Sequence, residues 1–377
     1  MTSDQTPPAP AEIDLPKVQL GRTGKSVSRM GLGGFHQLEI DAEAVSNVID
    51  TFLACGGNYI ETARAYGSGA SENKIGRALE SRRDKVILAS KTGAATADEA
   101  RRDLEESFKQ LRTDHLDFYF LHGVDAQKLE TVTAPGGAVE GLMAARSEGL
   151  IDGIGLSSHT PATYLEAMDR IDLSLILVWC NYLDNQNYPI IPEQILPEAM
   201  RRGVGVTGMK PLADGLLHES VADAMAYCLG MGAEVAVCGA NSPVQVRQSA
   251  AAVAAGPADA EQIQRILNEA PELGHYVCRR CGQCPDSLMD LFGWEGMIDR
   301  QMIDLQSRDP ANHALRARLS NWFHNDQAAR DAFAAAGYDP AELQAAAMEI
   351  TCPYHINVHR KTRIALAKLM GQPINRL

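Results

Sequence analysis

The sequence contains no apolar run that approaches the roughly 20 residues needed to cross a lipid bilayer. Its first residues, MTSDQTPPAPAEIDLP, also lack the basic start and apolar core of a signal peptide. We therefore expect a cytoplasmic protein without a membrane partner. The Pro-rich residues 1–16 are predicted to form a disordered tail.

Positive charge is the second shortage. Lys and Arg together number 35 and Asp and Glu number 48, which gives a formal net charge of −13. A surface of this sign repels the phosphates of nucleic acids and the head groups of anionic lipids. Neither nucleic acid nor membrane is therefore expected as a partner, and a small-molecule substrate remains open.

A glycine-rich dinucleotide fingerprint is also missing. The segment GLGG at 31–34 follows a predicted strand but does not have the GxGxxG spacing of a doubly wound nucleotide-binding sheet. Because that sheet is the main rival to a barrel, this absence favours the barrel.

Eight short apolar segments are present instead, and helical patterns separate them. They lie at 29–34, 58–61, 85–90, 116–121, 152–157, 175–180, 204–209 and 234–239. None alternates strictly between apolar and polar residues, which is typical of strands buried on both faces. Eight strand–helix units predict an α/β fold of the (β/α)8 TIM-barrel type over residues 17–262.

Polar side chains gather at the ends of three neighbouring predicted strands, where barrel enzymes carry their chemistry. Glu61 ends the second strand and Tyr66 lies in the following loop. Lys91 ends the third strand and His122 follows the fourth. The carboxylate and the ammonium could form a rim ion pair, and the two rings could serve packing. Their matching depth in adjacent strands favours a catalytic group.

This group suits the reduction of a carbonyl. A phenol has a pKa of about 10, but a nearby ammonium lowers that value. We expect Lys91 to lower the pKa of Tyr66, and Glu61 to hold the lysine. Tyr66 would then donate a proton while His122 orients the carbonyl. The side chains offer no hydride, so a nicotinamide cofactor would supply it.

Several ordered stretches resemble the aldo/keto reductase family across nearly the whole barrel. They are LGRTGKSVSRMGLGG (20–34), GGNYIETARAYGSGASENKIGRAL (56–79), ILASKTG (87–93), LRTDHLDFYFLHGVD (111–125), GIGLSSH (153–159) and GVGVTGMKPLADG (203–215). The resemblance implies an NAD(P)-dependent oxidoreductase that reduces a carbonyl or oxidises an alcohol. It places the family's Asp–Tyr–Lys–His tetrad at Glu61, Tyr66, Lys91 and His122, with glutamate in place of aspartate.

The resemblance also marks a cofactor pocket in which this sequence departs from the family. Its residues are Ser157, Ser158, Leu177, Met209, Lys210, Gly239, Asn241 and Gln245. Leu177 replaces a Gln that binds the nicotinamide amide, and Met209 replaces a stacking aromatic residue. Gly239 and Gln245 stand where relatives often have Lys and Arg for the 2′-phosphate of NADP, a loss for which Arg247 could compensate. Either NADP or NAD is expected.

Two other functions remain open. A lyase or isomerase could reuse the same barrel, and the departures at Glu61, Ser158, Leu177 and Met209 favour it. A non-catalytic, nucleotide-binding regulator is the other alternative. The presence of the tyrosine, lysine and histidine together argues against that regulator.

Four of the eight cysteines cluster in residues 263–377, which we expect to form a mostly helical C-terminal domain. Cys278, Cys281 and Cys284 have C-x2-C-x2-C spacing, and Cys352 directly precedes a proline. Clustered cysteines without a secretory leader indicate metal before disulfides. The pattern resembles the ferredoxin-like extension of some aldo/keto reductases, which implies a [4Fe–4S] cluster. Zinc and free thiols are the alternatives, and the sequence identifies no electron-transfer partner.

Overall fold

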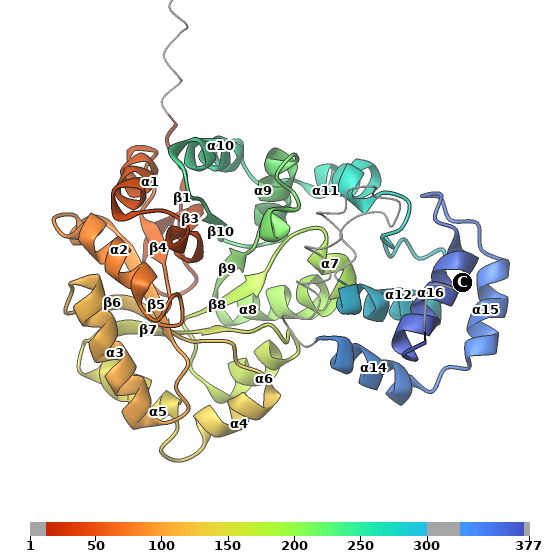
Figure 1. Cartoon of the computed structure of the whole chain (residues 1–377), viewed down its shortest axis with the longest axis horizontal. Coiled ribbons are helices and arrows are strands. Elements are labelled where there is room, and N and C mark those ends of the chain that lie inside the picture. The colour runs from red at the N-terminus through yellow and green to blue at the C-terminus, as the bar shows by residue number, and fades with distance from the viewer. Residues whose placement is uncertain (1–12, 300–324, 373–377) are drawn as a thin grey trace, which may run out of the picture.

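The computed structural model describes residues 13–299 and 325–372 (Figure 1). Eight parallel strands close into a barrel in the order β10-β3-β4-β5-β6-β7-β8-β9. They are β3 (Met30–Gly33), β4 (Tyr59–Glu61), β5 (Ile87–Thr92), β6 (Leu116–Leu121), β7 (Ile151–Ser157), β8 (Leu175–Trp179), β9 (Gly205–Met209) and β10 (Val235–Gly239). The predicted (β/α)8 barrel is confirmed.

Helices surround the barrel, as Figure 1 shows. They are α1 (Ala42–Ala54), α2 (Ala70–Leu79), α3 (Ala97–Leu111), α4 (Ala126–Thr133), α5 (Ala138–Ser147), α6 (Thr163–Arg170), α8 (Leu196–Arg202), α9 (Val221–Gly230) and α10 (Pro243–Ala254). Local sequence fixes their ends and faces. Thr96 and Glu99 form a capping box at the start of α3, and Leu104 and Leu111 share its buried face.

The predicted strand bounds shift by up to two residues. The largest shift is in β5, which was expected at 85–90 and lies at Ile87–Thr92. Lys91 therefore lies within β5, where it is the pairing partner of Phe120 in β6. A strand residue is held by hydrogen bonds on both sides, so its side chain has a fixed direction.

An antiparallel hairpin precedes the barrel and was not predicted. It consists of β1 (Lys17–Gln19) and β2 (Ser26–Ser28). Three residues per strand are too few to show an alternating pattern. Leu15, which the sequence places in the disordered tail, is 2% exposed and packs in the barrel core. The ordered fold therefore begins before residue 17.

Four short segments interrupt the loops at the barrel's edges. They are the 3-10 turns η1 (Phe35–Leu38), η2 (Arg83–Lys85) and η4 (Ala213–Gly215), and the single π turn η3 (Ile191–Ile195). A short helix, α7 (Asp184–Asn187), follows β8. Of these, η1, η4 and α7 follow the C-terminal ends of barrel strands, where they can shape a site.

The C-terminal residues form helices beyond the barrel. They are α11 (Ala260–Glu269), η5 (Pro271–Leu273), α12 (Asp286–Asp299), α14 (Asn325–Ala336), α15 (Pro340–Met348) and α16 (Val358–Leu369). The expected boundary between residues 262 and 263 falls inside α11. A second apolar cluster joins α11 to the loop after β8, because Ile266 packs with Tyr182 and Leu183.

The last four helices share a core of their own, in which Leu291, Leu343 and Leu366 are buried. Glu295 lies buried among them, with carboxylate oxygens 2.7 Å from Lys361 Nζ and 2.8 Å from Lys368 Nζ. Burial opposes its charge, but the two ammonium groups outweigh that effect and lower the pKa of Glu295 to about 2. The carboxylate is therefore ionised and binds α12 to α16.

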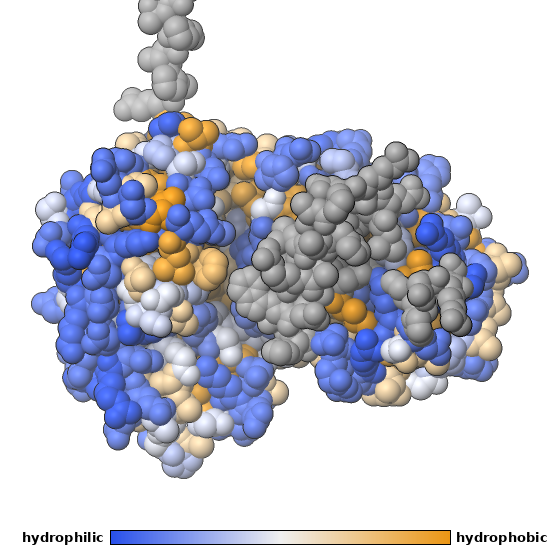
Figure 2. All heavy atoms as spheres, in the orientation of Figure 1, coloured by the Kyte–Doolittle hydropathy of each residue, from blue (hydrophilic) through white to orange (hydrophobic). Residues whose placement is uncertain are grey.

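Hydrophilic residues cover most of the barrel's helical surface in the view of Figure 2. In the part of the chain that the structure describes, no helix combines the length and the apolar character needed to span a bilayer.

Candidate active site

A cavity of about 1020 Å³ opens at the C-terminal ends of the barrel strands. The predicted tetrad, Glu61, Tyr66, Lys91 and His122, lines it together. The parallel strands bring these residues to one end of the barrel, although they are far apart in the sequence. The volume is at the upper end of the range for small-molecule and cofactor sites.

The centre of the tetrad is a buried ion pair. Lys91 Nζ donates to Glu61 Oε1 at 2.8 Å and to the carbonyl oxygen of Thr62 at 2.9 Å. Burial acts to lower the pKa of Lys91, but Glu61 and Tyr66 favour the charged form, and the pKa is raised. Lys91 is therefore an ammonium at neutral pH. The longer side chain of glutamate reaches the lysine at normal hydrogen-bonding distance.

Tyr66 lies between two aromatic rings and the ammonium. Its ring centre is 5.2 Å from that of Phe35 and 5.7 Å from that of His122, both in T-shaped contacts, and Lys91 Nζ is 5.3 Å from the Tyr66 ring centre. Burial raises the pKa of Tyr66, and Lys91 offsets only part of that rise. Lys91 thus lowers this pKa, as expected, but the sequence did not show that desolvation is the larger effect. The phenol keeps its proton at neutral pH.

His122 follows β6 and is partly buried at the cavity wall. Burial, followed by the positive charge of Lys91 and smaller effects of His159 and Lys128, lowers its pKa to about 3. The imidazole is therefore neutral at physiological pH. A neutral ring offers one N–H donor to a substrate oxygen without adding a competing charge.

Most of the predicted cofactor residues also line the cavity. They are Ser157, Leu177, Met209, Lys210, Gly239, Asn241 and Gln245. Ser158 is not among the lining residues, because its hydroxyl donates to the carbonyl oxygen of Val124 at 2.6 Å. Lys210 Nζ is 3.2 Å from the carboxylate of Asp214. The cavity thus extends from the tetrad to the first turn of α10.

Several lining residues escaped the sequence reasoning. They are Phe35, His36, Glu39, His159, Asp214, His218 and Gln248. His36 and Glu39 belong to the segment that follows β3, and His159 follows β7. The rule that found the tetrad, polar residues after a strand's C-terminal end, could have found these three as well.

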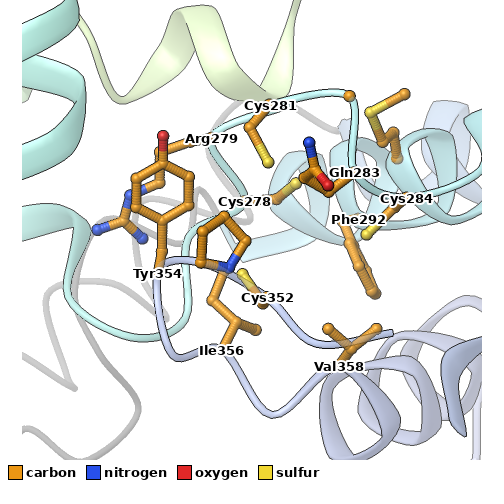
Figure 3. A pocket seen from close by; sticks show the side chains of 13 residues that line it. Cys278, Arg279, Cys281, Gln283, Cys284, Phe292, Cys352, Tyr354, Ile356 and Val358 are labelled. Atoms are coloured by element: carbon orange, nitrogen blue, oxygen red, sulfur yellow. The ribbon is translucent and has the colours of Figure 1, made fainter. Parts of the chain in front are cut away.

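The four clustered cysteines lie together in the C-terminal domain. Cys278, Cys281, Cys284 and Cys352 line one pocket, across which the triplet's loop faces the Cys352 loop (Figure 3). Its other walls include apolar side chains such as Phe292, Ile356 and Val358, and the backbone N–H of Arg280 donates to Cys278 Sγ at 3.4 Å.

The four cysteines lie around this pocket in Figure 3. Among the described residues, no group of three or more His, Cys, Asp or Glu has the close arrangement that holds a single metal ion. An iron–sulfur cluster is larger than one ion and separates its ligands further. A donor set of four thiols, an N–H…S contact and apolar walls fits such a cluster.

The barrel is similar to known proteins. Residues 29–228, more than half of the 377-residue chain, match the model of the aldo/keto reductase family. An uncharacterised oxidoreductase of Bacillus subtilis, YqkF, is 27% identical over 55% of this chain and 68% of its own length. L-galactose dehydrogenase of Arabidopsis thaliana is 29% identical over 53% of this chain and 66% of its own length.

A solved structure has the same architecture. The holo form of the aldo-keto reductase AKR11C1 from Bacillus halodurans superposes with a TM-score of 0.60 at 26% identity. It covers 67% of this chain and 95% of its own length. The relative is therefore matched almost entirely, whereas about a third of this chain lies outside the match.

Proposed function

The chain belongs to the aldo/keto reductase family of oxidoreductases, and we propose that it uses NAD(P) to reduce a small carbonyl compound or to oxidise the matching alcohol. The observation that carries this proposal is the Lys91 ammonium. It is fully buried against Glu61, lies near the Tyr66 ring, and faces a cavity large enough for a dinucleotide. A buried charge costs free energy to desolvate, so its position at the strand ends supports a chemical role.

In this proposal Tyr66 donates its phenolic proton to the carbonyl oxygen of the substrate. Neutral His122 donates a hydrogen bond to the same oxygen and fixes its position. Lys91 stabilises the negative charge that forms on Tyr66 as the proton leaves, and Glu61 holds the lysine in place. When bound, the nicotinamide supplies the hydride to the carbonyl carbon.

The Tyr66→Phe variant tests this mechanism. We expect turnover of any accepted carbonyl to fall by roughly 10²–10⁴-fold, because only the phenol donates the proton. Nicotinamide fluorescence titrations should give an unchanged dissociation constant. Tyr119→Phe is the control, since Tyr119 is buried against Ser107 and does not line the cavity.

Two results would contradict the proposal. A Tyr66→Phe protein with most of its turnover would remove Tyr66 from the acid role. A folded wild-type protein that binds neither NADH nor NADPH would remove the nicotinamide mechanism altogether.

We further propose that Cys278, Cys281, Cys284 and Cys352 bind one [4Fe–4S] cluster. The support is the donor set and the pocket that all four thiols line. Protein purified without oxygen should contain iron and acid-labile sulfide in equal amounts and absorb broadly in the visible range. Stoichiometric zinc without iron in such a preparation would show that the site is a zinc site.

A further inference from the structure

The cavity has two ends, and they differ in chemistry. At one end lie Tyr66, Lys91 and His122, which must face the reacting carbon of the nicotinamide under the proposed function. At the other end lie Glu39, Asn241, Gln245 and Gln248, beside the start of α10. Under the proposed function the nicotinamide half lies at the tetrad, which leaves the part of the cavity beside α10 for the adenosine half.

A carboxylate is held at this second end. Asn241 Nδ2 donates to Glu39 Oε2 at 2.9 Å, and His36 Nδ1 is 3.0 Å from Glu39 Oε1. The Glu39 side chain is 47% exposed, so it can also contact a ligand. Its two oxygens are hydrogen-bond acceptors.

Two side chains hold the segment that carries Glu39 in place. Lys74 Nζ donates to the carbonyl oxygens of Gln37, Leu38 and Ile40, at 3.0, 3.3 and 2.6 Å. Gln37 Nε2 donates to the carbonyl oxygen of Ala240 at 2.7 Å, which ties η1 to the end of β10. The carboxylate is therefore positioned by the fold.

Gly239, the last residue of β10, leaves room for this arrangement. A Cβ atom on Gly239 would lie 2.2 Å from His36 Cδ2. The His36 ring thus occupies the space into which a longer side chain at position 239 would project. A lysine there would have to displace the ring that contacts Glu39.

The same end offers little to a phosphate. Among the described residues, the lysines that line the cavity are Lys91 and Lys210, which pair with Glu61 and Asp214, and no arginine lines it. Two positions in the first turn of α10 offer no free backbone N–H to a phosphate. Pro243 has no N–H, and the N–H of Gln245 donates to Ser242 Oγ at 3.4 Å. A second phosphate on the adenosine ribose would face Glu39 instead of a cation.

We propose that Glu39 makes this site selective for a nicotinamide dinucleotide whose adenosine ribose carries no 2′-phosphate, NAD rather than NADP. The carboxylate accepts hydrogen bonds from the ribose hydroxyls and repels a 2′-phosphate, as acidic residues do at other NAD sites. This proposal rests on the proposed function and adds the cofactor that the site selects.

Equilibrium binding of NADH and NADPH tests it, at about pH 8 so that ordinary histidines are neutral. The wild-type dissociation constant should be about 10-fold or more higher for NADPH. Glu39→Gln should reduce that ratio to about 2, mainly by tightening NADPH binding. Glu43→Gln removes an exposed carboxylate that does not line the cavity, and it should keep the wild-type ratio.

The wild-type protein gives a second test that needs no variant. AMP should displace bound NADH more effectively than adenosine 2′,5′-bisphosphate, because the two fragments differ only in the 2′-phosphate. Equal or tighter binding of NADPH, or a ratio unchanged by Glu39→Gln, would overturn the role of Glu39 and leave the proposed function standing. Folded protein that binds neither dinucleotide would overturn both.

Discussion

The length of the Glu61 side chain determines which of its carboxylate oxygens contacts Lys91. Its Oε1 atom reaches Lys91 at 2.8 Å, while its Oε2 atom is buried without a hydrogen-bond partner among the described residues. The ion pair is thus made by one carboxylate oxygen only. The Thr62 carbonyl supplies a second contact to the lysine, so the ammonium does not depend on Glu61 alone for its position.

We expect Glu61→Asp to keep most of the activity. Glu61→Ala should lower turnover by roughly 10²-fold, because a lysine that loses its carboxylate partner can move by about 1 Å, and such a displacement of a catalytic group is costly. Glu61→Ala also leaves a buried ammonium unpaired, which should reduce the free energy of unfolding by about 3 kcal/mol. Steady-state kinetics and denaturant unfolding measure the two effects. Equal activity in all three proteins would mean that the carboxylate is dispensable.

His122 should remain neutral across the physiological range. Because burial and Lys91 lower its pKa to about 3, its ring should take up no proton between pH 8 and pH 5. Nitrogen-15 NMR of labelled histidine, assigned with His122→Gln, follows this directly. A His122 midpoint near 6.5 would contradict the assigned electrostatics.

Candidate catalytic residues were predictable where they lie at or just after the end of a strand. Tyr66 and His122 were found because polar residues after buried strands are conspicuous. The net pKa of Tyr66 was not predictable, because it depends on how far burial outweighs one ammonium. Glu39 could have been found by the same rule, since it lies in the segment after β3, but its contact with Asn241 depends on the fold.

At the scale of the elements, strand identity followed from composition, but strand ends did not. Lys91 lies within β5 because pairing with β6 continues to Thr92, and a partner's register leaves no mark on the strand's own sequence. The hairpin β1–β2 was missed because its strands are short. Helix α3 was predictable because its N-terminal cap and its apolar face both indicate a helix over the same residues.

Helix α12 meets α7, the short helix that follows β8 on the barrel, through a glycine. A Cβ atom on Gly296 would lie 1.8 Å from Asn187 Oδ1, whereas one on Gly293 would lie 3.7 Å from its nearest neighbours. Gly296→Ala should therefore push α12 away from the barrel and destabilise the protein by about 1–3 kcal/mol. Gly293→Ala is the matched control on the same helix and should be neutral or stabilising by up to about 1 kcal/mol.

Thermal unfolding and limited proteolysis separate these two variants. Faster cleavage of the C-terminal helices in Gly296→Ala, with an intact barrel, is the expected pattern. If both variants behave like wild type, the contact between α12 and α7 does not require a glycine at position 296.

For the whole molecule, the C-terminal core is built from pieces that lie far apart in the chain. The triplet precedes α12 and Cys352 precedes α16, so a cluster bound by all four thiols would join both ends of this core. Cys352→Ser should lower the iron content or make the cluster oxygen-labile, and it should speed proteolysis near α15 and α16. Cys55→Ser changes a cysteine buried in the barrel and should leave both readouts unchanged.

Full iron content and wild-type protease resistance in Cys352→Ser would remove Cys352 from the ligand set. The sequence could suggest that set from spacing alone, but it could not show that a loop before α16 returns to the triplet. That return depends on the shared apolar core of α12, α15 and α16, whose residues are spread over the whole domain.

The barrel closes by pairing its first strand, β3, with its last, β10. During synthesis, a chain that has reached α9 carries β3 and β9 as two open edges, each with unpaired N–H and C=O groups. Neither edge is satisfied until residue 239 has left the ribosome, and a chain emerges at about 5–20 residues per second. The growing polypeptide must therefore keep most of a parallel sheet from pairing with its neighbours before closure becomes available.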